Sequence, residues 1–258
     1  MFFRIKSYLK YILKSTNLHG IHSPFIYKFL DDCLYAKTDP KNIQLFSQFK
    51  KLLLSNKNTI TVTDFGAGSK VFNSNKRAVN KIAKHAGIHF KQAAILINIA
   101  NYFKPTTILE IGTSLGLGTT ALHLGSPQSK IITLEGCPNT LKIAKNQFKK
   151  FDFTNIEPIV GEFSNTLKML DDDLVFDLVY FDGNHKEKAT LTYFEFCLKH
   201  KNNNSIFIFD DIHWSLEMEN AWKSIKNHSE VTITIDLFQW GIVFFRKEQQ
   251  KEHFVIRV

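Results

Sequence analysis

Cysteine is scarce in this sequence. Its 258 residues include three cysteines, Cys33, Cys137 and Cys197, and no two of them form a Cys-x-x-Cys spacing. Three thiols cannot all pair with one another, so we expect neither a disulfide framework nor a structural zinc site. This usage fits a protein kept in a reducing compartment, and we expect a cytoplasmic location.

Long apolar runs are missing as well. No stretch approaches the roughly 18 apolar residues that a membrane-spanning helix needs, so no transmembrane segment is expected. The early charges of Arg4 and Lys6, with no small-residue cleavage site after them, argue against a secretory signal peptide. The apolar content is still 44%, with 24 Phe, which allows the large buried core of one α/β domain or of a domain with an appendage.

Acidic residues are scarce in the first part of the chain only. Residues 1–105 contain 17 Lys or Arg and 4 Asp or Glu, a net charge of +13, whereas residues 106–258 contain 16 and 20, a net charge of −4. This asymmetry indicates an anionic partner for the basic part, or packing of one part against the other. We expect a basic, mostly helical N-terminal extension over residues 1–105 that covers an α/β domain over residues 106–258.

The basic part begins with a predicted amphipathic helix over residues 2–14. Its apolar residues share one face and its basic residues occupy the rest: Phe2, Ile5, Leu9, Ile12 and Leu13 against Arg4, Lys6, Lys10 and Lys14. We expect this helix to pack on the body of the protein with its basic face in solvent. The alternative is an anchor for a membrane surface or a nucleic acid. Further helices are predicted near residues 23–35, 41–54, 76–86 and 90–103.

Strands and helices alternate after Pro105. Strands are predicted over residues 108–111, 131–134, 156–160, 176–181 and 205–209, with helices over residues 119–124, 139–151, 165–170, 186–200 and 215–228. This alternation predicts a parallel sheet with helices on both faces. Two last strands, over residues 231–238 and 242–246, are too close for a parallel crossover and must form an antiparallel hairpin. We therefore expect an α/β fold with a seven-stranded sheet whose last strand is antiparallel.

A glycine-rich turn joins the first of these strands to its helix. Residues 108–118 read ILEIGTSLGLG. The glycines let a ligand approach the backbone, and the start of the following helix favours negative groups. A dinucleotide site would need Gly-x-Gly-x-x-Gly, which this spacing does not give. A hydrolase elbow centred on Ser114, with Asp236 and His253 as partners, matches Gly-x-Ser-x-Gly, but such an elbow normally follows several strands rather than the first.

The turn resembles the first motif of the class I S-adenosylmethionine-dependent methyltransferases, in which an apolar strand and an acid precede Gly-x-(Gly/Ser)-x-Gly. Glu110, Gly112, Ser114 and Gly116 match that motif position by position. The resemblance implies the Rossmann-like seven-stranded sheet of that family and S-adenosylmethionine as the cofactor, with these four residues in its binding site.

The resemblance continues through the next two strands. Glu135 ends the second strand, at the position where the family places a carboxylate that accepts hydrogen bonds from both ribose hydroxyls. Gly136 follows it. Glu162 and Phe163 follow the third strand, where the family places an acid near the adenine amine. A second glycine-rich segment, residues 63–69, looks similar, but no acid-ended strand follows it, and we interpret it as a loop of the N-terminal part.

Acidic residues gather after the fourth and fifth strands. Asp182 follows the fourth strand, and Asp210 and Asp211 follow the fifth. Neighbouring strands lie about 4.8 Å apart, and their carboxyl ends open on the crevice at the switch point of such a sheet. We therefore expect three carboxylates to converge there beside the cofactor. Carboxylates so close repel one another unless a proton or a cation joins them, and their oxygens suit Mg²⁺, Mn²⁺ or Ca²⁺.

These acids narrow the resemblance to the metal-dependent O-methyltransferases, over about residues 100–247. It implies Asp182, Asp210 and Asp211 as metal ligands, with Asp182 also a catalytic and cofactor-binding residue. In the sugar-modifying branch the base lies three residues after the first acid, which is His185 here. A divalent cation would lower the pKa of an acceptor hydroxyl, and His185 could then take its proton. His213 and Trp214 are candidates for the lining of the acceptor pocket.

Three functions stay open at this point. The first is O-methylation of a small molecule, and the basic part of the chain favours an anionic acceptor. The second is methylation of an RNA ribose, with the basic extension as the nucleic-acid contact. Methylation of bases is not expected, because the chain has neither an Asn/Asp-Pro-Pro-Tyr motif nor a Pro-Cys nucleophile. The third is a protein that binds S-adenosylmethionine without catalysis.

Overall fold

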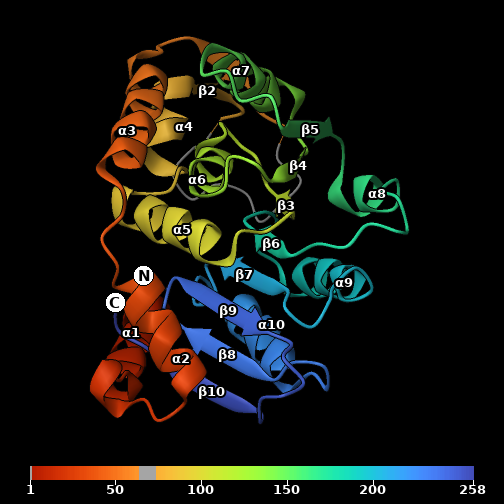
Figure 1. The fold of residues 1–258 in the computed structure, drawn as a ribbon. Helices are drawn as coiled ribbons and strands as arrows, with labels where there is room; N and C mark the ends of the chain where they lie inside the picture. Colours follow the sequence, from red (N-terminus) through yellow and green to blue (C-terminus); the bar gives the residue numbers. More distant parts are fainter. Residues whose placement is uncertain (1, 64–73) are drawn as a thin grey trace. The chain divides into compact units, whose positions relative to one another are not determined.

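The computed structural model describes residues 2–63 and 74–258, which form two compact units. Unit 1 consists of the residues up to Tyr35 together with Leu170–Val258, and unit 2 of Ala36–Met169 (Figure 1). The predicted division at residue 105 falls inside unit 2, and the role of residues 1–105 as a cover stays a prediction. The glycine-rich segment over residues 63–69 lies outside the described residues, apart from Thr63.

Unit 2 is built around three parallel strands: β3 (Thr107–Ile111), β4 (Lys130–Glu135) and β5 (Ile156–Val160). β4 lies between the other two, so that Ile111 is opposite Leu134 and Glu135 is opposite Val160. The apolar residues of β3 and β4 are buried, as expected of strands covered on both faces. Because the strands are parallel, their carboxyl ends meet at one edge, where the glycine-rich turn begins.

Helices surround these strands, and a short hairpin completes unit 2. The elements are α3 (Pro40–Ser55), α4 (Val79–His85), α5 (Phe90–Phe103), α6 (Leu117–Gly125), α7 (Pro138–Lys150) and α8 (Phe163–Leu167), with β1 (Thr59–Thr61) paired to β2 (Lys76–Ala78). The start of α3 follows from its sequence. Asp39 caps it by accepting a 2.8 Å hydrogen bond from the Lys41 backbone N–H, and Pro40 occupies the first helical position.

Unit 1 contains five strands in the order β10-β8-β9-β7-β6. They are β6 (Leu178–Phe181), β7 (Ile206–Asp210), β8 (Ile233–Asp236), β9 (Trp240–Phe244) and β10 (Glu252–Val255). β9 is antiparallel to both β7 and β8, whereas β6 is parallel to β7 and β10 is parallel to β8. The reversed strand is therefore β9, as the short connection after β8 predicted.

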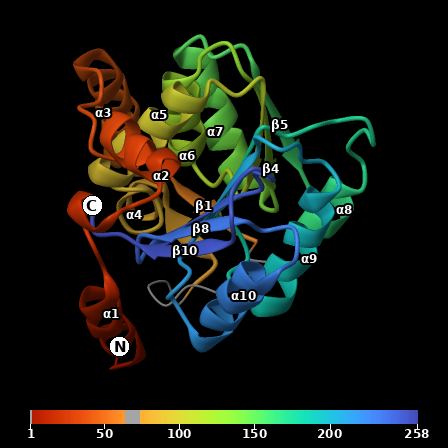
Figure 2. The same cartoon turned by 60° about the horizontal axis from the view of Figure 1, so that its bottom comes forward.

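Helices cover both faces of the strands of unit 1. They are α1 (Phe2–Lys14), the 3₁₀ turn η1 (Leu18–Gly20), α2 (Pro24–Phe29), the π-helical turn η2 (Leu30–Leu34), α9 (Glu187–Leu198) and α10 (Leu216–Asn227). Phe29 of α2 packs edge-on against Phe244 of β9, and Trp222 of α10 lies against Gly241 of the same strand. Residues 241 and 244 point to opposite faces of a strand, so α2 and α10 cover opposite faces. Figure 2 shows α9 and α10 side by side.

The structure confirms most of the predicted elements and corrects two. The prediction omitted one strand, β10, which pairs with β8. Its residues Glu252 and His253 are exposed and give no apolar pattern. The predicted helix over residues 76–86 begins only at Val79, because Lys76–Ala78 pair with β1. Across the described ranges 2–63 and 74–258, no helix combines the length and apolar character needed to cross a membrane.

Candidate functional site

Glu110 of β3 is the buried centre of a hydroxyl network in unit 2. Only 1% of its surface is exposed, and its Oε2 accepts hydrogen bonds from the hydroxyls of Thr119, on α6, and Thr133, on β4. The Thr113 hydroxyl lies 2.5 Å from that of Thr133 and extends the network to the turn. Burial raises the pKa of Glu110 to about 7, although the two hydroxyl donors oppose the rise. The network thus ties the first motif to the neighbouring strand.

The second carboxylate oxygen of Glu110, Oε1, differs from Oε2 in its hydrogen bonding. It is buried and has no hydrogen-bond partner among the described residues. A buried acceptor left in this state costs on the order of 1–3 kcal/mol. A proton on the acid, or a hydrogen-bond donor brought by a ligand, would remove that cost.

The turn between β3 and α6 uses the left-handed backbone region three times. Gly112, Ser114 and Gly116 have φ values of 113°, 48° and 83°. The Gly112 N–H donates to the Leu134 carbonyl at 2.9 Å, which fastens the turn to β4. A Cβ at Gly116 would lie 2.6 Å from the Phe148 ring of α7, so only glycine fits there without displacement. The motif glycines thus allow a tight turn directly before the N-terminus of α6.

Glu135 lies at the end of β4, and the backbone orients its carboxylate. Oε2 accepts a 2.6 Å hydrogen bond from the Ser114 N–H, and Oε1 accepts a 2.8 Å hydrogen bond from the Cys137 N–H. Glu135 and the following Gly136 are half-buried. Each carboxylate oxygen can accept more than one hydrogen bond, so this carboxylate is held in place and can still receive hydroxyl donors.

Glu162 and Phe163 lie at the start of α8, where a structural role explains the acid. Glu162 is the N-cap: its Oε2 accepts from the Asn165 N–H at 3.2 Å and its Oε1 from the Ser164 hydroxyl at 3.1 Å. Phe163 is buried at 8% exposure. A contact of this pair with the adenine of a cofactor stays a prediction.

In unit 1 the structure brings together three of the predicted site residues. Asp182, His185 and Asp210 are half-buried, and one ligand atom from each lies within 4.8 Å of the other two. His185 Nε2 is 3.8 Å from Asp182 Oδ1. The parallel pairing of β6 with β7 explains the arrangement, because Phe181 is opposite Phe209 and the next residues are the two acids. The two carboxylates fit a divalent cation such as Mn²⁺ or Mg²⁺, with the imidazole of His185 beside them.

The two consecutive acids after β7 have different surroundings. Asp210 Oδ1 accepts a 2.6 Å hydrogen bond from the indole Nε1–H of Trp240, which lies opposite it on β9. Asp211 is in the left-handed region, with φ 54°, and its Oδ1 lies 3.9 Å from Nη2 of Arg4 on α1. The Arg4 guanidinium also stacks over the Trp214 ring at 5.0 Å. Asp211 is therefore directed to α1, and its role as a metal ligand stays a prediction.

His213 is held between two carboxylates. Its Nδ1 lies 3.0 Å from Glu219 on α10, its Nε2 lies 2.9 Å from Asp236 on β8, and its ring stacks on Phe238. Burial disfavours the charged ring, but the hydrogen bonds and charges of Asp236 and Glu219 outweigh burial and raise the pKa of His213. Both ring nitrogens are engaged, so His213 fixes the loop after β7. Its place in an acceptor pocket stays a prediction.

Comparison with known proteins bears on both units. Residues 109–212 match a family described as a methyltransferase domain. The crystal structure of the SAH-bound methyltransferase PaMTH1 of Podospora anserina aligns with a TM-score of 0.62 at 18% identity, over 83% of this chain and 91% of that chain. The chain is thus similar to a methyltransferase domain over residues 109–212 and shares the fold of PaMTH1. The expected Rossmann-like fold is confirmed by this match.

Two further solved structures share the fold of the methyltransferase domain. TomG, an O-methyltransferase of Streptomyces achromogenes in complex with SAM, aligns with a TM-score of 0.58 at 15% identity, over 82% of this chain and 92% of that chain. An O-methyltransferase of Bacillus cereus in complex with SAH aligns with a TM-score of 0.56 at 16% identity, over 85% and 97%. At these identities the likeness concerns the fold alone.

Curated relatives of the methyltransferase domain are similar over about half of this chain. O-methyltransferase hkm8 of Aspergillus hancockii is 31% identical over 142 residues, which are 52% of this chain and 55% of that protein. A bifunctional methyltransferase of Rickettsia bellii is 25% identical over 149 residues, 56% of this chain and 26% of that protein. This chain thus spans about half the length of the first relative and a quarter of the second.

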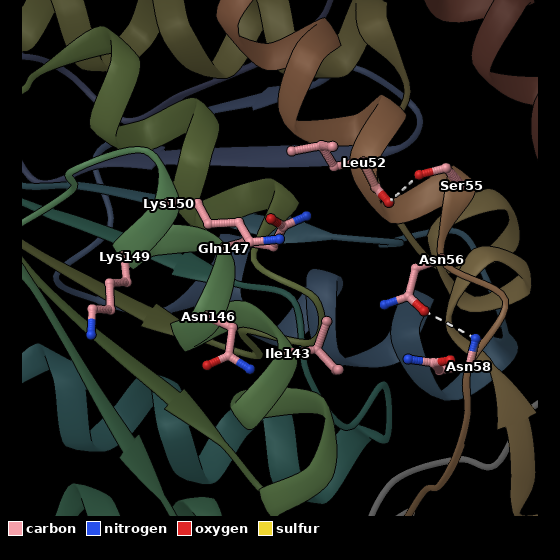
Figure 3. A pocket seen from close by; sticks show the side chains of 9 residues that line it. All are labelled: Leu52, Ser55, Asn56, Asn58, Ile143, Asn146, Gln147, Lys149 and Lys150. Atoms are coloured by element: carbon pink, nitrogen blue, oxygen red, sulfur yellow. Dashed lines mark hydrogen bonds between the residues drawn. The ribbon is translucent and has the colours of Figure 1, made fainter.

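A groove of about 740 Å³ lies elsewhere in unit 2, between α3 and α7 (Figure 3). Leu52, Asn56 and Gln147 are among its lining residues, with Lys149 and Lys150 at the end of α7. None of the predicted cofactor or metal residues lines it, and we assign it no part in the methyltransferase site. The two lysines also lie at the C-terminal end of a helix, where cations stabilise the helix itself.

Sequence reasoning missed the residues that support the site. Thr119 and Thr133 hold Glu110, Trp240 holds Asp210, and Arg4 contacts Asp211. No local motif marks them, because each lies on a different element from the acid that it contacts. The observed register places Trp240 opposite Asp210, but the predicted last strand begins at residue 242 and so leaves Trp240 in the connection.

Proposed function

We propose that this chain is an S-adenosylmethionine-dependent O-methyltransferase that methylates a hydroxyl of a small, anionic molecule with the help of a divalent cation. The observation that carries this proposal is the gathering of Asp182, His185 and Asp210 within 4.8 Å in a chain with a methyltransferase domain. The relative from Aspergillus hancockii is named an O-methyltransferase, which supports the same chemistry. The three cysteines are buried thiols and fit a reducing compartment, so we place the enzyme in the cytoplasm.

Unit 2 provides the groups that would hold S-adenosylmethionine. Glu135 offers a half-buried carboxylate, already oriented by two backbone N–H groups, to the ribose hydroxyls. The buried Oε1 of Glu110 would accept a hydrogen bond from a donor of the cofactor. The turn stays close to the backbone of the neighbouring strand because of Gly112, Ser114 and Gly116. Further contacts with the cofactor would come from Gly136, Glu162 and Phe163. The bound cofactor supplies the electrophilic methyl group.

Unit 1 provides the groups that would hold the cation and move the proton. Asp182 and Asp210 would supply oxygen ligands, and Asp211 would join them if it exchanged its contact with Arg4. When bound, a divalent cation lowers the pKa of an acceptor hydroxyl and orients it. His185 would take the hydroxyl proton at Nε2, the atom that faces Asp182, and the carboxylate would stabilise the resulting imidazolium. The Trp240 indole keeps Asp210 in position throughout.

The proposal is tested by methyl transfer from labelled S-adenosylmethionine to panels of catechol, sugar and RNA acceptors. Each panel is run with Mg²⁺ or Mn²⁺ and with excess chelator. We expect transfer to a small-molecule hydroxyl that stops in chelator and returns when the cation is restored. Transfer to RNA instead would favour the ribose alternative, for which the net charge of +13 on residues 1–105 is the supporting observation. Undiminished transfer in chelator would remove the cation from the proposal.

A further inference from the structure

Helix α1 is attached to unit 1 by its polar and aromatic residues. Among residues 3–14 of the helix, Ser7 and Tyr11 are buried, at 5% and 7% exposure. The Tyr11 hydroxyl donates a 2.6 Å hydrogen bond to the Ile256 carbonyl, and the rings of Tyr8 and Tyr11 lie 4.9 and 5.4 Å from that of Phe238. The helix therefore packs on the body of the protein, as predicted, but not through its aliphatic face.

Three aliphatic residues of α1 face solvent, whereas Ile12 is half-buried. Ile5, Leu9 and Leu13 are 51%, 58% and 87% exposed. Residues four apart on a helix lie above one another, so these three form a continuous stripe. On a wheel of 3.6 residues per turn the stripe lies opposite Tyr11. The amphipathic pattern that suggested a core-facing helix thus leads in the structure to an unpartnered apolar face.

A row of lysines borders this stripe. Lys6, Lys10 and Lys14 each follow one stripe residue by one position, and all three are exposed. No Asp or Glu occurs among residues 1–30, so this face has one sign of charge. Two copies of the face pressed together would set like charges against each other. A surface that is apolar inside and anionic outside has the matching chemistry, and an anionic lipid bilayer is such a surface.

We propose that α1 is an interfacial helix that binds anionic lipid bilayers reversibly. Ile5, Leu9 and Leu13 would enter the boundary between headgroups and acyl chains, while Lys6, Lys10 and Lys14 contact lipid phosphates. Three exposed aliphatic side chains give a weak attachment, so the lysines decide which membranes bind. This function does not depend on the chemistry proposed for the methyltransferase domain.

The test is co-sedimentation of the full chain with vesicles of phosphatidylcholine alone and of phosphatidylcholine mixed with phosphatidylglycerol. We expect binding to the mixed vesicles that weakens as salt is raised, and little binding to the neutral ones. Replacing the three lysines by Gln should weaken binding on the order of 100-fold. Leu9→Glu and Leu13→Glu together should abolish it. Leu216→Glu is the matched control, because Leu216 is 62% exposed on α10 of the same unit; it should bind like the parent chain.

Several results would overturn the proposal. One is equal binding to neutral and anionic vesicles, and another is no binding to either. A dimer in sedimentation velocity that Leu9→Glu dissociates would show that a second copy covers the stripe. RNA binding lost in the lysine variant, without vesicle binding, would assign the face to a nucleic acid. The substituted side chains are exposed, and thermal melting of each variant verifies its fold. Methyl transfer without vesicles should be unchanged, which separates this test from that of the proposed function.

Discussion

The acids of the two units are stabilised in different ways. In unit 2, hydroxyl and backbone N–H groups donate to Glu110 and Glu135, so folding itself prepares both carboxylates. In unit 1, Asp182, His185 and Asp210 place their ligand atoms within 4.8 Å of one another. Two carboxylates at such a distance repel each other, and a cation between them would offset that repulsion. This difference supports the proposal that unit 2 receives the hydroxyl donors of a cofactor and unit 1 a cation.

Removal of the proposed base should give the largest effect and should leave the function of unit 2 intact. We expect His185→Ala to lower turnover by about 10²–10⁴, the range typical of a general base. The affinity for S-adenosylhomocysteine, measured by calorimetry, should stay within about twofold, because His185 is proposed to act on the acceptor hydroxyl and not on the cofactor. His22→Ala, at an exposed histidine of the same unit, is the control. Full turnover in His185→Ala would remove this residue from the chemistry.

Glu110 should give unit 2 a dependence of stability on pH. Its pKa is raised to about 7 by burial, from an ordinary value of 4.5. Below pH 4.5 the acid is protonated in both the folded and the unfolded chain. Between these two pKa values the unfolded chain ionises first, so the free energy of unfolding falls as pH rises. The fall is on the order of 3 kcal/mol, and above pH 7 it is complete.

The matched variant is Glu110→Gln, which retains an acceptor for Thr119 and Thr133 but cannot ionise. Urea unfolding across pH 4.5–8 should show a flatter profile for the variant than for the parent chain. Saturating S-adenosylhomocysteine should reduce the difference if the cofactor donates to Glu110. Identical profiles for the two proteins would contradict the assignment of the pH dependence to this acid.

Glu135 should give the smallest effect, confined to cofactor binding. We expect Glu135→Ala to weaken binding of S-adenosylhomocysteine by roughly 10-fold, corresponding to about 1–2 kcal/mol for the lost hydroxyl hydrogen bonds. The loss is moderate because the variant also leaves the N–H groups of Ser114 and Cys137 to water. Calorimetry measures it, with Glu157→Ala on β5, an exposed acid of the same unit, as the control. An unchanged affinity would exclude Glu135 as a ribose ligand.

The features of the fold that could be predicted from the sequence are those determined by residues close together in the chain. The alternating strands and helices depend on nearby periodicity, and the antiparallel hairpin of β8 and β9 depends on the length of one connection. The closeness of Asp182 and Asp210 required only that β6 and β7 be parallel neighbours. By contrast, the contact between Arg4 and Asp211 joins residues more than 200 positions apart, and no pattern in the sequence marks it.

The exposed stripe of α1 shows the other limit of prediction. Periodicity identified the amphipathic helix but not the face that packs. That face carries Tyr11, which is buried with a hydrogen bond to Ile256 and a ring contact with Phe238. Strand β10 was missed for a related reason: its pairing with β8 uses backbone groups, while Glu252 and His253 face solvent. Backbone pairing at the edge of a sheet leaves little trace in the side chains.

The hydrogen bond between Trp240 and Asp210 places a fluorescent side chain at the predicted cation site. Trp240 is 2% exposed, and its indole N–H donates directly to a carboxylate of the predicted cation site. A cation that draws electron density from Asp210 changes the polarity at that N–H, and with it the emission of the buried indole. Cation binding at this site should therefore change the fluorescence of the protein during titration with Mn²⁺ or Mg²⁺, and this measurement needs no methyl acceptor. A Trp240→Phe chain provides the background from Trp214 and Trp222.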